Sequence, residues 1–243
     1  EGIKNLNTVE PLFWKSQDKK TKEALLSIVV LNCNKGFFEN EFGKTSYAIN
    51  SYEKAWKTFH TYQLTDYDII ENCLKPLGNL YITTGDYKNA EKTINSYYRI
   101  AKANKNAPQK TAAILDLSNV YQNSGRTTEA IALIEKTIQA EKPAAEQREL
   151  LLNALGQNYL SRSVDKDAEN AESAFLKAIP LLKKNNAQAE TLLGTYVNLY
   201  KIKIKNQTDE ALDYFAKAKT VFENLPKKKP RKKAAFYLEE ANL

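Results

Sequence analysis

Small and bulky residues recur along the chain at a nearly constant interval. Five times an alanine is followed four residues later by a large apolar residue, and successive alanines lie 40 to 42 positions apart. These pairs are Ala48/Tyr52, Ala90/Ile94, Ala130/Ile134, Ala171/Phe175 and Ala211/Phe215. A fixed period of this size predicts a stack of structural repeats, an architecture that presents a long surface and usually binds rather than catalyses.

A second pattern lies upstream of these alanines and predicts another helix. It is carried by the segments 77–81, 117–121, 155–159 and 196–200, each of which ends in tyrosine. Two amphipathic helices joined by a glycine turn are the simplest interpretation of such a unit. Gly78 lets the first helix approach the second closely, while Gly85 and Gly125 favour the left-handed conformation that ends a helix.

Together the two patterns resemble the signature of the tetratricopeptide repeat (TPR) family, Leu-Gly-x-x-Tyr followed by Ala-x-x-x-Phe. The best matches are Leu77, Gly78, Tyr81, Gly85, Tyr87 and Ala90, then Leu155, Gly156, Tyr159, Ala171, Phe175 and Ala178. The first unit departs from the signature in having Glu39 where tyrosine is expected. The period exceeds the common one of about 34 residues by about seven, as in long-period variants. The resemblance implies an all-α, right-handed superhelical solenoid of antiparallel helix pairs.

The repeat positions also predict how the chain is organised. We expect a lead-in at 1–21, an array of about five repeats at 22–225, a basic loop at 226–233, and at 234–243 the first helix of a truncated sixth repeat or a capping helix. Repeat boundaries are expected near 22–66, 67–107, 108–144, 145–186 and 187–225. The chain starts at Glu1 and contains no methionine, so we expect it to be a fragment of a larger protein.

Positive charge is concentrated in one short run rather than spread along the array. The net charge is +7, and six positive charges lie in the basic loop, so the rest of the chain carries only +1. The run consists of Lys227, Lys228, Lys229, Arg231, Lys232 and Lys233. Such a run binds phosphates, which makes a nucleic acid or an anionic surface an alternative partner. It has no interleaved aromatic residues, which favours a solvated loop.

Few residues offer catalytic or metal-binding chemistry. His60 is the only histidine, so neither a site built on several imidazoles nor a Ser or Cys triad has the residues it needs. Cys33 and Cys73 are the only cysteines and are expected to be buried in helices. Acidic residues near 165–169, including Asp167, are expected on a solvated face. The sequence predicts no enzyme activity and no cofactor. No apolar run approaches the ~18 residues of a membrane span, so a soluble chain is expected, cytoplasmic or exported with its leader missing.

The best candidate site comes from the resemblance, because first helices line the concave groove of TPR proteins. The residues expected in a peptide-binding groove are Lys75, Asn79, Asn119, Gln122, Gln157 and Asn198. Amide side chains both donate and accept hydrogen bonds, so such a row suits a peptide backbone. The alternative is that asparagine is common at these positions whatever the ligand, and the sequence leaves the two open.

The carboxylate-clamp TPRs, which hold chaperone C-terminal tails, provide a sharper comparison. Lys75 and Asn79 match the first two residues of that clamp. At the next clamp position, however, Asp116 replaces the expected asparagine, and Leu150 and Ala154 replace the expected lysine and arginine. An acidic residue there repels a terminal carboxylate, so the sequence argues against a clamp.

The leading hypothesis is therefore a non-catalytic scaffold that binds a protein or peptide segment in its groove. Long repeats of this kind are also similar to the N-terminal arrays of bacterial CHAT-domain proteins. That resemblance implies an alternative, in which the chain is the recognition or regulatory arm of a caspase-like protease located outside it. The sequence does not distinguish a passive scaffold from an array whose shape responds to a ligand.

Overall fold

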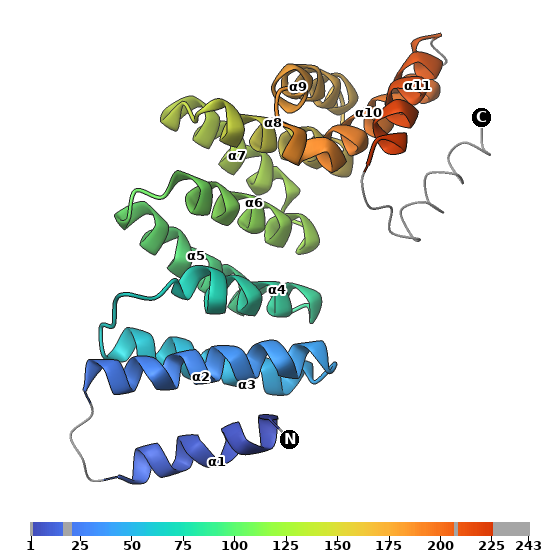
Figure 1. Ribbon diagram of the computed structural model, residues 1–243. Helices are drawn as coiled ribbons and strands as arrows, with labels where there is room; N and C mark the ends of the chain where they lie inside the picture. Colours follow the sequence, from blue (N-terminus) through green and yellow to red (C-terminus); the bar gives the residue numbers. More distant parts are fainter. Residues whose placement is uncertain (1, 17–20, 207–208, 226–243) are drawn as a thin grey trace. The chain divides into compact units, whose positions relative to one another are not determined.

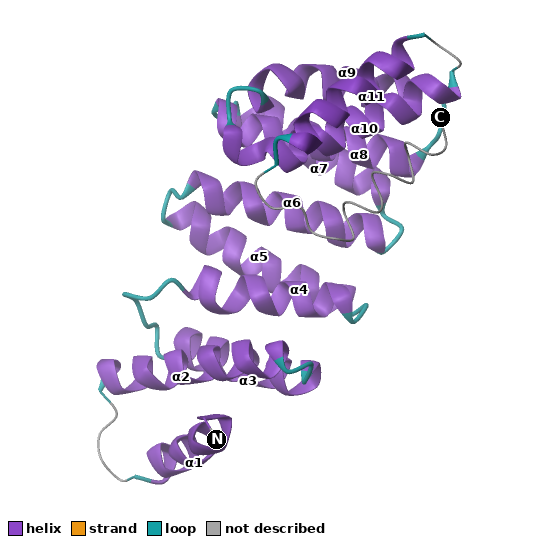
Figure 2. Cartoon of the chain, turned by 45° about the vertical axis from the view of Figure 1, so that its right-hand side comes forward, coloured by secondary structure: helices purple, strands orange, loops and turns teal. Residues whose placement is uncertain are grey.

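The computed structural model describes residues 2–16, 21–206 and 209–225, and the regular structure in these ranges is entirely helical (Figure 1). This confirms the predicted all-α fold class, and Figure 2 shows helices joined by loops, without a strand in the described chain. The α-helices are α1 (Gly2–Lys15), α2 (Lys22–Glu41), α3 (Thr45–Thr61), α4 (Lys75–Thr83), α5 (Tyr87–Ala103), α6 (Ala107–Asn123), α7 (Thr127–Glu141), α8 (Ala145–Arg162), α9 (Asp167–Leu182), α10 (Ala189–Lys205) and α11 (Glu210–Glu223). A π-helical turn, η1 (Ile70–Leu74), precedes α4, and a 3-10 turn, η2 (Asn186–Gln188), precedes α10.

The chain divides into two compact units, Glu1–Ala130 and Ile131–Leu243, and the division falls inside α7. In unit 1, α2 packs on α3, and α4 packs on α5, which also contacts α6. In unit 2, α8 packs on α9 and α10 packs on α11. Because only a few residues join the helices of each pair, the two helices run antiparallel. No helix in the described residues is both long and apolar enough to cross a bilayer.

Small residues on the first helices allow the close packing that the sequence predicts. A Cβ atom added to Gly78 of α4 would lie 3.2 Å from Cγ1 of Ile94 on α5. The contact is tighter in unit 2, where a Cβ on Gly156 of α8 would lie 2.5 Å from the Phe175 ring of α9. Ala90, the small residue of α5, is fully buried. The small-against-large arrangement is therefore the packing contact that holds a helix pair together.

The predicted glycine turns are also confirmed. Gly85 and Gly125 have φ angles of +77° and +79°, which non-glycine residues rarely adopt. The residue after Gly85, Asp86, stands directly before α5, and its side chain accepts a hydrogen bond of 3.1 Å from the Asn89 N–H. This is an N-cap, which satisfies a backbone donor that the helix itself leaves unpaired.

The tyrosine of the first-helix pattern joins successive repeats by a hydrogen bond. In three repeats its hydroxyl donates to a glutamate on the second helix of the preceding repeat. These bonds are Tyr81–Glu53, Tyr121–Glu91 (3.1 Å) and Tyr159–Glu135 (2.5 Å). Burial, together with the bond to Glu135, raises the pKa of the Tyr159 hydroxyl to about 12. The sequence pattern located these tyrosines without indicating their partners.

The first repeat replaces this tyrosine with a buried acid. Glu39 is 3% exposed and accepts a hydrogen bond of 2.6 Å from the Ser51 hydroxyl, which lies on the facing helix α3. The pair satisfies a polar group that would be costly to bury alone. Glu39 therefore joins the two helices of one repeat, whereas the tyrosines join neighbouring repeats.

The lead-in segment contains a helix that the repeat pattern did not indicate. Helix α1 packs on α2, and its Glu10 is 8% exposed. The Glu10 carboxylate accepts hydrogen bonds of 3.2 Å from both the Asn32 amide and the Lys54 ammonium. Burial of the carboxylate is thus balanced by a cation and an amide from the first repeat.

The expectation of a solvated Asp167 is wrong. Its side chain is 1% exposed and accepts bonds of 2.7 and 2.9 Å from the Arg162 guanidinium and one of 2.9 Å from the Val164 N–H. Ser163 and Lys166 both have positive φ angles, so the turn folds back and carries Asp167 onto Arg162. The carboxylate closes the turn between α8 and α9, and the guanidinium lowers the pKa of Asp167 below its usual range.

Two glycine-to-alanine substitutions test the close packing. Gly156→Ala should reduce the free energy of unfolding by roughly 1–3 kcal/mol, because the new methyl group meets the buried Phe175 ring. Gly194→Ala in α10 is the matched control, since an added Cβ atom there would have no neighbouring atom within 4 Å. This substitution should stabilise the protein by about 0.5–1 kcal/mol, because alanine has a higher helix propensity than glycine. Denaturant unfolding measures both values. Equal stability of the two variants would contradict the packing role of Gly156.

Tyr159→Phe tests the bond between repeats. The substitution should cost about 1 kcal/mol at neutral pH, since it leaves the Glu135 carboxylate without its donor. The folded-state pKa of Tyr159 is about 12 and lies above the ordinary value of about 10. Its stabilising effect is therefore complete below pH ~10 and is lost as the pH rises toward ~12. Unfolding measured across this range should show a smaller loss of stability in the variant than in the wild type. An identical pH dependence would rule out this coupling.

Candidate functional site

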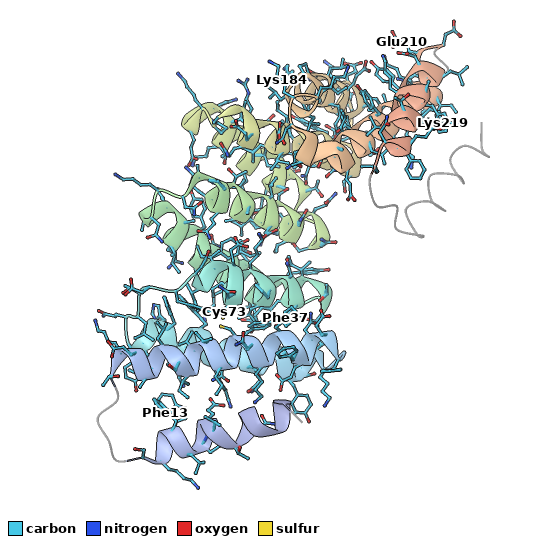
Figure 3. The ribbon with its side chains drawn as sticks, viewed as in Figure 1. Phe13, Phe37, Cys73, Lys184, Glu210 and Lys219 are labelled. Atoms are coloured by element: carbon cyan, nitrogen blue, oxygen red, sulfur yellow. The ribbon has the colours of Figure 1, made fainter. Side chains whose placement is uncertain are left out.

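Unit 1 contains a pocket between the first helices of its first two repeats. The pocket has a volume of about 480 Å³, which lies in the range of pockets that hold small ligands. Its lining comes from α2, α3, η1 and α4 and consists of Phe37, Asn40, Thr45, Tyr52, Glu71, Lys75, Pro76, Asn79, Leu80 and Thr83. Figure 3 shows Phe37 in the region between α2 and α4. Two of the predicted groove residues, Lys75 and Asn79, therefore belong to one concave site.

The π-helical turn η1 sets the position of the pocket's charged residues. Pro76 has no N–H to donate, and immediately before it the backbone widens so that the Lys75 N–H bonds to the carbonyl of Ile70. From Glu71 within this turn, Lys75 and Asn79 follow at intervals of four residues along η1 and α4. The Lys75 ammonium lies 3.2 Å from the Glu71 carboxylate, which makes the pair electrically neutral. Such turns are frequent at functional sites.

Two amide side chains reach this pocket without a protein partner. Asn40 and Asn79 are exposed, and among the described residues neither side chain makes a hydrogen bond. Each amide offers donors and an acceptor, as a peptide backbone does. The sequence analysis identified Asn79 but missed Asn40, because the first repeat departs from the signature close to this residue.

The remaining predicted groove residues lie on first helices in both units. In unit 1, Asn119 is exposed and Gln122 is half-buried, and both lie on α6. In unit 2, Gln157 of α8 is exposed and Asn198 of α10 is half-buried. Their side-chain amides form no hydrogen bond with other described residues. Their role in ligand binding stays a prediction.

A partly buried carboxylate lies beside the pocket. Asp116 of α6 accepts a hydrogen bond from the Tyr97 hydroxyl. Burial raises the pKa of the Asp116 carboxyl, while Tyr97 and the positive charge of Lys75 oppose this rise and Glu71 adds to it. The three charged groups, Glu71, Lys75 and Asp116, therefore influence one another and sum to one negative charge when both carboxyls are ionised.

The two thiols lie in the core of unit 1, as the sequence predicts. Cys33 of α2 and Cys73 of η1 are 2% and 0% exposed. The Cys73 thiol donates a hydrogen bond of 3.2 Å to the carbonyl of Tyr52, a residue that lines the pocket. Cys73 thus helps to fix the π-helical turn against α3.

The other candidate groups do not gather into a second site of this kind. His60 is exposed at the end of α3, where its ring lies 5.1 Å from that of Trp56. In the described part of the chain, no group of three or more His, Cys, Asp or Glu side chains is placed to hold a metal ion. The basic residues Lys227, Lys228, Lys229, Arg231, Lys232 and Lys233 lie outside the described residues, as does the segment 234–243.

No protein-family model and no curated protein sequence matches the chain, whereas solved structures match its fold. The apo form of RapI aligns with a TM-score of 0.74 at 17% identity, over 98% of this chain and 63% of RapI. The TPR-like repeats of a putative kinesin light chain from Podosopora anserina give a TM-score of 0.59 at 16% identity, over 84% of this chain and 97% of that one.

The quorum sensor NprR from B. thuringiensis, in its apo form, aligns with a TM-score of 0.67 at 14% identity, over 97% of this chain and 62% of NprR. NprR in complex with its cognate peptide NprX gives a TM-score of 0.55 at 15% identity, over 97% of this chain and 64% of NprR. The chain thus spans less than two thirds of the length of RapI and NprR. At these identities the likeness establishes the architecture alone, and the chain has the TPR-like fold of stacked helix pairs.

Proposed function

We propose that the chain is a non-catalytic scaffold that binds an extended segment of a peptide or protein along the first helices of unit 1. The observation that carries this proposal is the unpartnered amide of Asn79, which opens on the pocket between α2 and α4. Asn119 stands at the same position of the next repeat, 40 residues later, and is equally unpartnered within the described residues. Amides at one repeat position on successive first helices suit the recurring donors and acceptors of an extended backbone.

The expected affinity follows from the strength of such bonds. A hydrogen bond formed in exchange for water contributes about 1 kcal/mol, so two amides alone do not hold a peptide. Apolar burial in the pocket supplies the rest, since its lining includes Phe37, Pro76 and Leu80. Peptide binding as such is supported by NprR, a protein of similar architecture that was solved in complex with its cognate peptide NprX.

The other hypotheses drawn from the sequence stay predictions. Binding of nucleic acid or an anionic surface by the run at 227–233 depends on residues outside the described ranges. Membership of a larger protein, with a CHAT-type protease beyond this chain, depends on sequence beyond Leu243. The continuation of the groove through Gln157 and Asn198 concerns unit 2 and needs its own variants.

Substitution of the two asparagines tests the proposal. Peptides selected by the full chain from a displayed library of short random sequences serve as probes, and calorimetry measures their affinity. Asn79→Ala and Asn119→Ala should each weaken binding about fivefold, because each removes one or two hydrogen bonds of modest strength. Asn50→Ala is the matched control, since Asn50 is an exposed asparagine of α3, a second helix. Unchanged affinity in the double variant Asn79→Ala/Asn119→Ala would show that the peptides bind elsewhere.

A further inference from the structure

The pocket between α2 and α4 has apolar walls and a neutral mouth. Phe37, Pro76 and Leu80 contribute apolar surface, and Phe37 is 54% exposed although it is a large aromatic residue. Its ring contacts that of Phe38 edge to face, with centroids 5.5 Å apart. Glu71 and Lys75 are the charged residues of the lining, and they are paired with each other. An exposed aromatic ring at the edge of a pocket is a favourable contact for a bulky apolar side chain.

The surface beside the pocket has an excess of negative charge. Helix α6 is held against the segment before η1, because the Gln109 amide donates bonds of 3.1 and 3.2 Å to the Asp68 carboxylate. Asp116 follows Gln109 by seven residues, and Lys75 follows Asp68 by seven residues. Asp116 and Lys75 therefore lie at a similar height along the two first helices. Glu71 is one turn before Lys75. The Asp116 carboxyl is close enough to interact electrostatically with both Lys75 and Glu71, so two carboxylates act on this one ammonium group.

The negative excess identifies which ligand charge fits. Lys75 already has Glu71 as a partner at 3.2 Å, so an incoming carboxylate would have to compete with Glu71 and face the repulsion of Asp116. A positively charged ligand group would instead be attracted by Asp116, whose negative charge Lys75 does not neutralise because Lys75 is paired with Glu71. Asp116 is partly buried, so salt screens this attraction less than it would on an open surface. The chemistry therefore favours a ligand that is positively charged next to its apolar part.

We propose that unit 1 binds an extended peptide that places a bulky apolar side chain in the α2–α4 pocket and a lysine or arginine beside Asp116 and Glu71. This inference rests on the proposed function and adds to it the class of peptide. The apolar side chain contacts Phe37 and Leu80, and the backbone bonds to the amides of Asn40 and Asn79. The preference is opposite in sign to that of a TPR that clamps a terminal carboxylate.

Four peptide pools test the proposal with the full-length chain. Each pool has blocked ends, random flanks and three fixed central residues, which are Lys-Phe-Lys, Glu-Phe-Glu, Lys-Ser-Lys or Glu-Ser-Glu. The measurement is the fraction of each pool retained by the immobilised chain at equilibrium, at low and at physiological salt. Lys-Phe-Lys should be retained at least about tenfold better than Lys-Ser-Lys, because the ring gains apolar burial. It should exceed Glu-Phe-Glu by about threefold or more at low salt, and by less at higher salt.

Variants assign the two preferences to their residues. Phe37→Ala should reduce the preference for Phe over Ser, because Pro76 and Leu80 remain in the lining. Phe42→Ala is the control, since Phe42 is 70% exposed at the end of the same helix and does not line the pocket. Asp116→Asn should reduce the preference for Lys over Glu. Glu71→Gln should also reduce this preference, and because the Glu71 side chain is 44% exposed, its loss should affect folding less than that of Asp116. Thermal unfolding of each variant checks that it is folded.

The outcomes separate this inference from the proposed function. Equal retention of all four pools, with retention weakened about fivefold in Asn79→Ala, overturns the inference and leaves the proposed function standing. Preferential retention of the Glu-Phe-Glu pool overturns the charge assignment. Retention of no pool overturns both the inference and the proposed function.

Discussion

The residues that α4 contributes to the candidate site depend on how closely the two helices of a repeat approach each other. The approach is set by a residue without a side chain on one helix and a large side chain on the other, as at Gly78 and Ile94. Helices packed this closely hold α4 in a fixed position, which in turn fixes the direction of Lys75 and Asn79. A wider spacing would leave the same residues in the sequence but would not hold them at one pocket. Core packing and the position of the α4 residues in the candidate pocket are therefore consequences of the same contact.

The sequence predicted those parts of the structure that repeat. Helix pairs and buried small residues recur at each period, and a glycine turn recurs in the first three repeats, so each prediction is supported by several instances. Features that occur once were missed or wrongly assigned. The π-helical turn before Pro76 interrupts one helix only, and Asp167 is buried by a turn that exists in one repeat only. In both cases a local backbone conformation, rather than the hydrophobic period, determines where the side chain lies.

In the candidate site, too, the residues at repeated positions were predicted and the others were missed. Lys75 and Asn79 were found because they belong to a repeated position on a first helix. Phe37 and Asn40 were missed because they belong to the first repeat, whose signature is altered at Glu39. From the sequence, an aromatic residue in an apolar helix is expected to be buried in the core. The structure instead places Phe37 at the edge of the pocket, where it is 54% exposed. A pocket formed between two repeats has no pattern of its own within either of them.

The hydrogen bonds from the first-helix tyrosines define a structural unit that differs from the helix pair of one repeat. Each bond runs from the first helix of one repeat to the second helix of the repeat before it, as from Tyr121 to Glu91. A helix pair cut at its own ends therefore separates a donor from its acceptor on each side. The segment that carries a complete bond starts at a second helix and ends at the following first helix. Variants that shorten, lengthen or recombine this array should therefore be cut before a second helix and after the following first helix, because only then do Tyr81, Tyr121 and Tyr159 keep their carboxylate partners.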